Sequence, residues 1–166
     1  QTKAATIAAA EYEGPVYLRF GRPAVPVFTP ADQKFEIGKG ILMNEGSDVT
    51  IVATGHLVWE SLLAAAELEK EGISCEVINI HTIKPLDEEI ILNSVKKTGK
   101  IVTAEEHNIL GGLGESVARV LAQKLPTKQA FVAVEDKFGE SGTPSDLMKK
   151  YGIDSTAVIQ KVKSLL

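Results

Sequence analysis

The sequence is poor in cysteine and has no long apolar run. Among its 166 residues Cys75 is the only cysteine, which excludes a disulfide framework and a zinc site built on several thiolates. No stretch approaches the roughly 18 consecutive apolar residues that a membrane span needs, so we expect no membrane partner. The net charge of −4 offers no basic face to a phosphate backbone, so we expect no nucleic-acid partner.

The first residues also lack an initiator methionine and the pattern of a secretory signal peptide. We therefore expect the chain to begin inside a longer polypeptide. Cys75 lies in a strand-like run, residues 74–78, and is predicted to be a buried structural thiol and not a nucleophile. A reduced thiol without an export signal favours the cytoplasm.

The N-terminal part of the chain divides from the rest at a proline-rich stretch. Residues 2–13 are alanine-rich and predict a helix, which Gly14-Pro15 ends. Residues 16–20 predict a strand. The prolines at positions 23, 26 and 30 then exclude a helix or a central strand, so we place the main domain boundary in an extended linker here.

From residue 35 onward, strand-like and helix-like segments alternate. This alternation predicts βαβ units, and hence an α/β fold with a largely parallel sheet and helices on both faces. Asp87 and Ser145 are predicted to cap helices. The strands are expected at residues 35–38, 40–44, 48–53, 74–79, 100–105 and 130–134, and the helices at 56–71, 87–98, 115–124, 145–150 and 154–164.

Ligands of open parallel sheets gather at the carboxyl ends of the strands, and three segments fall there. The first is residues 54–56, where the imidazole of His56 could act as a general base. No nucleophile or carboxylate is placed by the sequence to orient it, so a structural turn residue is favoured. The third is residues 135–144, where the apolar Phe138 in a glycine loop indicates a contact surface.

The second segment is a glycine-rich turn that follows two glutamates. Such a turn can direct backbone N–H groups at an anion. However, Val117 stands where a third glycine of the dinucleotide fingerprint would fall, and the glutamates would repel a pyrophosphate. Consecutive side chains cannot easily face one ion, which disfavours a metal site. Close packing is the simpler explanation, and we keep the segment as a candidate interface or ligand loop, formed by Glu105, Glu106, His107, Gly111, Gly112 and Gly114.

Two arginines flank the end of the predicted strand 16–20. A guanidinium there, on Arg19 or Arg22, could hold a phosphate through two parallel hydrogen bonds. An arginine on the surface without a ligand is the simpler interpretation from the pattern alone.

The ordered set of motifs along the whole chain resembles the transketolase family, most closely the animal-like and split bacterial or archaeal members. Each motif is common, but their order is specific. The motifs are Gly14–Pro23, Phe35–Gly40, Val49–Gly55, Leu62–Leu68, Ile80–Asp87, Glu105–His107, Gly111–Glu115, Phe138–Gly142 and Tyr151–Ile153.

The resemblance implies the C-terminal part of an enzyme that uses thiamine diphosphate and Mg²⁺ to move a two-carbon ketol unit between sugar phosphates. It implies the tail of a pyrimidine-binding domain at 1–23, a linker at 24–34 and the C-terminal domain at 35–166. That domain is expected to be a five-stranded mixed sheet with one antiparallel strand that helps dimerisation. The family's cofactor site and activating glutamate lie outside the matched stretch, so this part is expected to bind no cofactor and to be inactive alone.

One site residue transfers from the family. Its arginine for the sugar phosphate matches Arg22, by the spacing to the following proline, so the resemblance favours a phosphate role for Arg22 over Arg19. The implied partners are the N-terminal transketolase domains or subunit, a second copy and the sugar phosphate. The alternatives are a standalone binding or regulatory module, or the same domain of a deoxyxylulose-phosphate synthase or an oxo-acid dehydrogenase β subunit.

Overall fold

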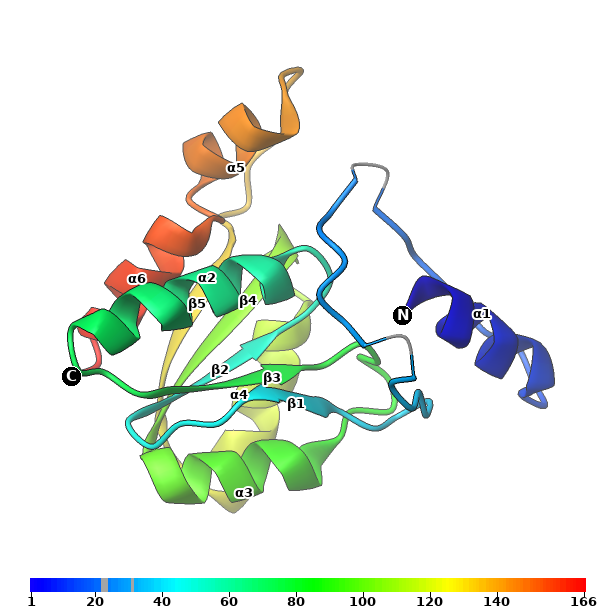
Figure 1. The fold of residues 1–166 in the computed structure, drawn as a ribbon, viewed down its shortest axis with the longest axis horizontal. Coiled ribbons are helices and arrows are strands. Elements are labelled where there is room, and N and C mark those ends of the chain that lie inside the picture. The colour runs from blue at the N-terminus through cyan, green and yellow to red at the C-terminus, as the bar shows by residue number, and fades with distance from the viewer. Residues whose placement is uncertain (22–23, 31) are drawn as a thin grey trace.

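A computed structural model describes residues 1–21, 24–30 and 32–166 of the chain. The elements between Ile41 and Lys163 form an α/β sandwich around one five-stranded sheet with the strand order β1-β3-β2-β4-β5 (Figure 1). The strands are β1 (Ile41–Asn44), β2 (Val49–Ala53), β3 (Cys75–Asn79), β4 (Lys100–Asn108) and β5 (Lys128–Val134). The helices are α1 (Thr2–Glu11), α2 (Leu57–Lys70), α3 (Glu88–Thr98), α4 (Leu113–Lys124), α5 (Pro144–Tyr151) and α6 (Ser155–Lys163).

The sheet is mixed, as the family resemblance implies. β2 pairs in parallel with β3 and β4, and β4 with β5, whereas β1 pairs antiparallel with β3. Every residue of β2 and β3 is buried, which explains why the apolar residues of β2 do not alternate with exposed polar ones. The alternation of strands and helices therefore predicted the fold class correctly.

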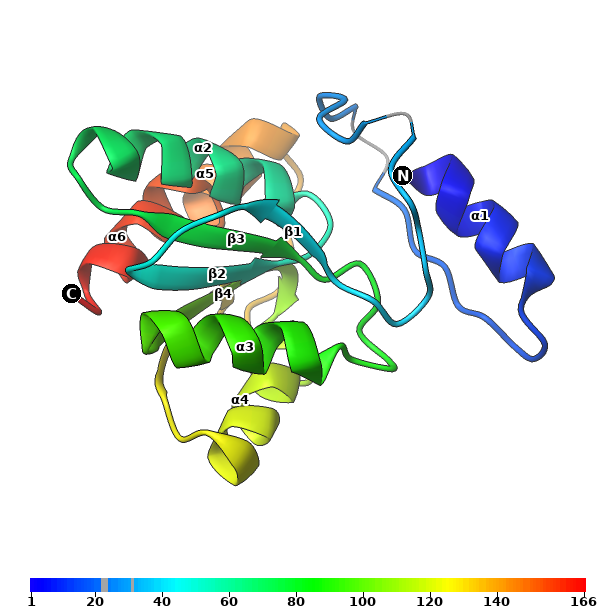
Figure 2. The same cartoon turned by 60° about the horizontal axis from the view of Figure 1, so that its bottom comes forward.

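Helices cover both faces of the sheet, and two apolar clusters form the core (Figure 2). One cluster joins the sheet to α2 and α6, and the other joins it to α3 and α4. β3 lies on one side of β2 and β4 on the other, so successive right-handed crossovers must place α2 and α3 on opposite faces.

Local signals explain where the helices begin and end. Asp87 caps α3 as predicted, because its carboxylate accepts a hydrogen bond from the backbone nitrogen of Ile90 at 3.3 Å. Gly99, at φ 68°, ends the same helix in the left-handed conformation. The predicted cap of α5 at Ser145 is wrong. Pro144 takes the first helical position, so Thr143 is the cap and its hydroxyl accepts from the nitrogen of Asp146.

Two of the predicted strands are not formed. Residues 16–20 are exposed and pair with no strand of the described chain, since a β-prone run becomes a strand only beside a partner. Residues 35–38 end in a turn, and the ring of Phe35 stacks on His81 with centroids 4.2 Å apart. In contrast, β4 extends three residues beyond its predicted end and so includes Glu106 and His107.

The N-terminal segment lies beyond the carboxyl end of β3, and α1 stands apart from the sandwich (Figures 1 and 2). The anchors of the segment to the domain include stacking of Phe28 on Trp59 and a hydrogen bond from the amide of Asn79 to Gln1. Large apolar side chains remain in water, with Tyr17 88% and Val27 95% exposed. Within the described residues, no helix combines the length and apolar character needed to cross a membrane.

Candidate functional site

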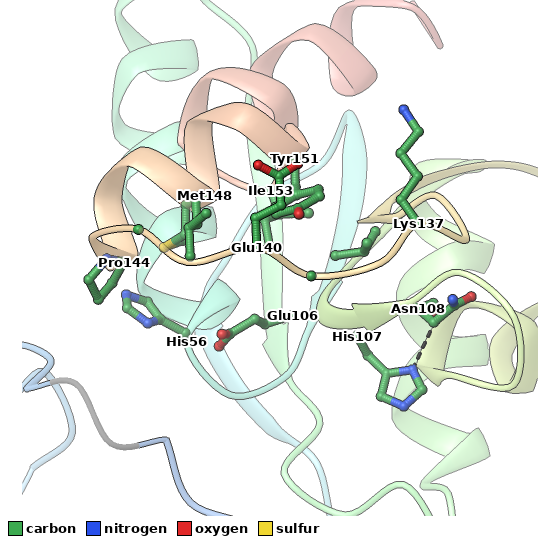
Figure 3. Close-up of a pocket in the computed structure, with 14 residues that line it drawn as sticks. His56, Glu106, His107, Asn108, Lys137, Glu140, Pro144, Met148, Tyr151 and Ile153 are labelled. Atoms are coloured by element: carbon green, nitrogen blue, oxygen red, sulfur yellow. Dashed lines mark hydrogen bonds between the residues drawn. The ribbon is translucent and has the colours of Figure 1, made fainter.

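The segments after β2, β4 and β5 meet at the carboxyl edge of the sheet, where a cleft of about 380 Å³ opens between them and α5 (Figure 3). This brings together all three loops in which the sequence placed candidate chemistry. The lining residues are His56, Glu106, His107, Asn108, Val134, Lys137, Gly139, Glu140, Gly142, Pro144, Leu147, Met148, Tyr151 and Ile153.

Glu105 points away from this cleft and into the protein. Its side chain is 3% exposed, and its carboxylate accepts hydrogen bonds from the backbone nitrogens of Leu113 at 2.7 Å and Gly114 at 2.8 Å. These two N–H groups belong to the first turn of α4 and would otherwise lack partners. The protein's own carboxylate therefore occupies the position at this helix end where an external anion would bind.

The glycine-rich turn is shaped by that carboxylate. A Cβ on Gly112 would lie 2.1 Å from an oxygen of Glu105, and a Cβ on Gly114 would lie 2.5 Å from the ring of Phe131. Only glycine fits at either place without a shift of the neighbours. Gly111 is exposed at φ 79°, and its nitrogen donates to Glu115.

Glu106 and His107 are the two members of the candidate loop that line the cleft. Successive side chains of a strand point to opposite faces, so Glu106 points away from Glu105. The buried part of β4 also ends at Glu105, and Glu106 and His107 are both exposed. The Glu106 carboxylate points toward the His56 side chain (Figure 3). The six candidate residues are thus divided between a packed turn and a cleft, and a ligand role for Glu106 and His107 remains a prediction.

Hydrogen bonds hold the loops around the cleft. Asn108 donates to the carboxylate of Asp136 at 3.1 Å, which links the segments after β4 and β5. Tyr151 donates its hydroxyl hydrogen to the carbonyl of Phe138 at 2.9 Å. Glu140 pairs with Lys150, and this hydrogen bond raises the pKa of the Lys150 ammonium above its usual value. The ring of Phe138 is 98% exposed.

The α5 side of the cleft was not predicted from the sequence. Met148, Tyr151 and Ile153 form part of its wall, although nothing in their local pattern indicates a site. Tyr151 and Ile153 do occur in the family motifs. Cys75 is buried as predicted, and burial, with a smaller contribution from Asp48, raises its thiol pKa to about 11.

Within the described residues, no group of three or more His, Cys, Asp and Glu side chains that could hold a metal ion is found. The N-terminus of α4, which follows the glycine turn, is filled by Glu105. The phosphate-binding candidate Arg22 lies outside the described residues, and the alternative Arg19 is exposed.

Comparison with known proteins identifies the family. The family model "Transketolase, C-terminal domain" matches residues 38–158. The 6-deoxy-6-sulfo-D-fructose transketolase subunit SqwH of Clostridium sp. (strain MSTE9) is 46% identical over 90% of this chain and 46% of its own length. The transketolase of Mus musculus is 35% identical over 99% of this chain and 27% of its own length.

A solved structure, "Split gene transketolase, inactive beta4 tetramer", superimposes with a TM-score of 0.96 and 46% identity over 99% of this chain and 54% of that one. The chain therefore spans about half the length of the two split proteins and about a quarter of the mouse enzyme. On the family match, the identity and the shared fold, the chain belongs to the transketolase C-terminal domain family.

Proposed function

We propose that the chain is the C-terminal part of a thiamine-diphosphate-dependent transketolase, which transfers a two-carbon ketol unit between sugar phosphates. The family match over residues 38–158 carries this proposal, together with relatives that are transketolases or transketolase subunits. In this assignment the chain contributes to assembly and dimerisation and is inactive alone. The pentose phosphate pathway and the cytoplasm are the proposed setting.

The N-terminal segment supports a proposed division into a tail at 1–23, a linker at 24–34 and the C-terminal domain at 35–166. In the first of these, residues 16–20 are extended and exposed, and Phe20 is 52% exposed beside Tyr17 at 88%. A β-prone segment of this kind is stabilised by joining a sheet. We infer that the sheet is that of a pyrimidine-binding domain upstream of residue 1 or on a partner subunit.

The same assignment places thiamine diphosphate and Mg²⁺ in the other parts of the enzyme. What this chain would add to the substrate site is Arg22, whose guanidinium suits a sugar phosphate.

Reconstitution tests the proposal. The chain would be combined with the cofactor-binding transketolase polypeptide of the same organism, thiamine diphosphate and Mg²⁺, and ketol transfer between sugar phosphates would be assayed. We expect transfer by the mixture and none by either polypeptide alone. Calorimetry should detect cofactor binding by the mixture but not by this chain.

Two outcomes would contradict the proposal. The first is transfer by this chain alone, and the second is a chain that forms a complex with the upstream polypeptide without restoring transfer. If the natural product also has the mass of this chain, 17.8 kDa, and forms no complex with that polypeptide, the standalone binding module becomes the better assignment.

A further inference from the structure

The cleft at the carboxyl edge lies at the topological switch point of the parallel strands. β3 follows β2 on one side and β4 returns to its other side, so the segments after β2 and β4 leave in opposite directions. In open α/β sheets, ligands bind in the crevice that this divergence creates. His56 follows β2 and Glu106 ends β4, and both line the cleft, whose volume of about 380 Å³ is within the range of small-molecule sites.

One wall of the cleft is apolar. Met148 and Ile153 are 8% and 4% exposed and continue into the hydrophobic core, and Val134 and Leu147 lie beside them. This wall suits the hydrocarbon or aromatic part of a ligand, since covering it removes apolar surface from water.

Several polar groups of the cleft offer hydrogen-bond acceptors to a ligand. His107 donates from Nδ1 to the carbonyl of Asn108 at 2.9 Å, so Nε2 is the ring nitrogen that a ligand can contact. Tyr151 donates its hydrogen to Phe138 and retains lone pairs on its oxygen. Glu106 adds a carboxylate. A ligand with several donors fits these groups better than one with several acceptors.

The two carboxylates of the cleft differ in whether a lysine or arginine pairs with them. Glu140 is paired with Lys150, whereas within residues 1–21, 24–30 and 32–166 no salt bridge to Glu106 is found. Lys137 lines the cleft, but its ammonium points away from the other labelled side chains (Figure 3). The negative charge of Glu106 is therefore the one that a ligand in the cleft would meet.

We propose that this cleft binds a small organic ammonium ion, whose charged amino group lies at Glu106 and whose apolar body lies against Met148 and Ile153. An ammonium group carries a positive charge that complements Glu106, and three N–H donors that can bond to the acceptors of the cleft. An anionic ligand would instead meet the carboxylate of Glu106. The inference rests on this chain alone and is independent of the proposed transketolase activity.

A charge series of three ligands tests the site. The chain would be titrated with 2-phenylethylammonium, with the neutral 2-phenylethanol and with the anionic phenylacetate, and the backbone-amide NMR shifts of the cleft residues would be followed. We expect saturable shifts at Glu106, His107, Met148 and Ile153 for the ammonium, with a Kd on the order of 1 mM. The alcohol should bind roughly tenfold more weakly, and the acid should produce no saturable shift.

Matched variants locate the charge. Glu106→Gln should weaken ammonium binding roughly tenfold or more, because the charge is lost and the shape is kept. Glu69→Gln makes the same change on the exposed surface of α2, away from the cleft, and should leave binding unchanged. The proposal is overturned by the absence of saturable ammonium binding, by equal binding of alcohol and ammonium, by preference for the acid, or by undiminished binding to Glu106→Gln.

Discussion

The carboxylate of Glu105 lies 2.8 Å from the backbone nitrogen of Gly114 and accepts its hydrogen bond. Its other oxygen accepts from Leu113. One buried side chain at the end of β4 thus caps the helix that follows it in the chain, and joins the strand to the helix across the glycine turn. Because the bond is between a charged acceptor and a helix N-terminus, we expect it to stabilise the fold strongly.

Removal of this carboxylate should destabilise the protein. Glu105→Ala leaves two buried N–H groups without partners, and we expect the free energy of unfolding to fall by about 2–4 kcal/mol. Urea denaturation followed by circular dichroism would measure the change. The exposed neighbour is the control, since Glu106→Ala should stay within about 0.5 kcal/mol of the parent. Equal losses for the two variants would contradict the capping role.

A methyl group at Gly112 should have a comparable effect for a steric reason. The Cβ of Gly112→Ala would lie 2.1 Å from an oxygen of Glu105, so the carboxylate must move away from its two donors. We expect a loss of about 1–3 kcal/mol in the same urea experiment. Gly139→Ala adds a methyl group where no atom lies within 4 Å and should be nearly neutral. If both alanines are tolerated equally, the turn does not depend on close approach.

The periodicity of the sequence predicted the five strands and the helices of the domain, because strands such as β2 and helices such as α3 carry their signals locally. It also predicted a strand at residues 35–38 that is not formed. The unpaired state of residues 16–20 could not be predicted in this way, since pairing depends on a partner strand and not on β-propensity. The antiparallel direction of β1 also depends on its partner strand, so the local pattern did not predict it. The family resemblance did imply one antiparallel strand.

The sequence predicted which loops form the candidate site, but it did not predict which side chains of those loops face the cleft. Glu105 and Glu106 are chemically identical, and the structure separates them because their side chains point to opposite faces of β4 and the buried part of the strand ends at Glu105. Where that burial ends depends on the elements packed around the strand, which the local pattern does not give. The contribution of Met148 and Ile153 to the cleft arises from the folding of α5 over the edge, which no local pattern encodes.

Acid should weaken the fold partly through Glu76. Burial alone would raise the pKa of this carboxyl, but hydrogen bonds from Lys97 and Ser94 outweigh it and hold the pKa below its usual value. A group with a lowered folded-state pKa contributes stability that is present at neutral pH and is lost as the pH falls through that pKa.

Glu76→Gln should therefore lower stability near pH 7 and reduce the further loss between about pH 7 and pH 3. Urea midpoints measured across this range would check the prediction. Glu69→Gln, an exposed carboxylate of α2 for which the described residues provide no ion pair, should retain the pH dependence of the parent. An unchanged pH profile in Glu76→Gln would contradict the stabilising role of the pair with Lys97.

Arg22 is predicted to act on the phosphate of the substrate in the reconstituted enzyme. Arg22→Lys keeps the charge but loses the planar pair of donors, so KM for a sugar phosphate should rise roughly tenfold or more while kcat changes little. The corresponding sugar without its phosphate lacks the group that Arg22 would bind, and its slow turnover should be unaffected by the substitution. Arg19→Lys is the matched control and should leave both substrates unchanged. Equal effects of Arg22→Lys on the phosphorylated and unphosphorylated sugars would show that the residue does not bind the phosphate, and would return it to the surface role that its pattern alone suggests.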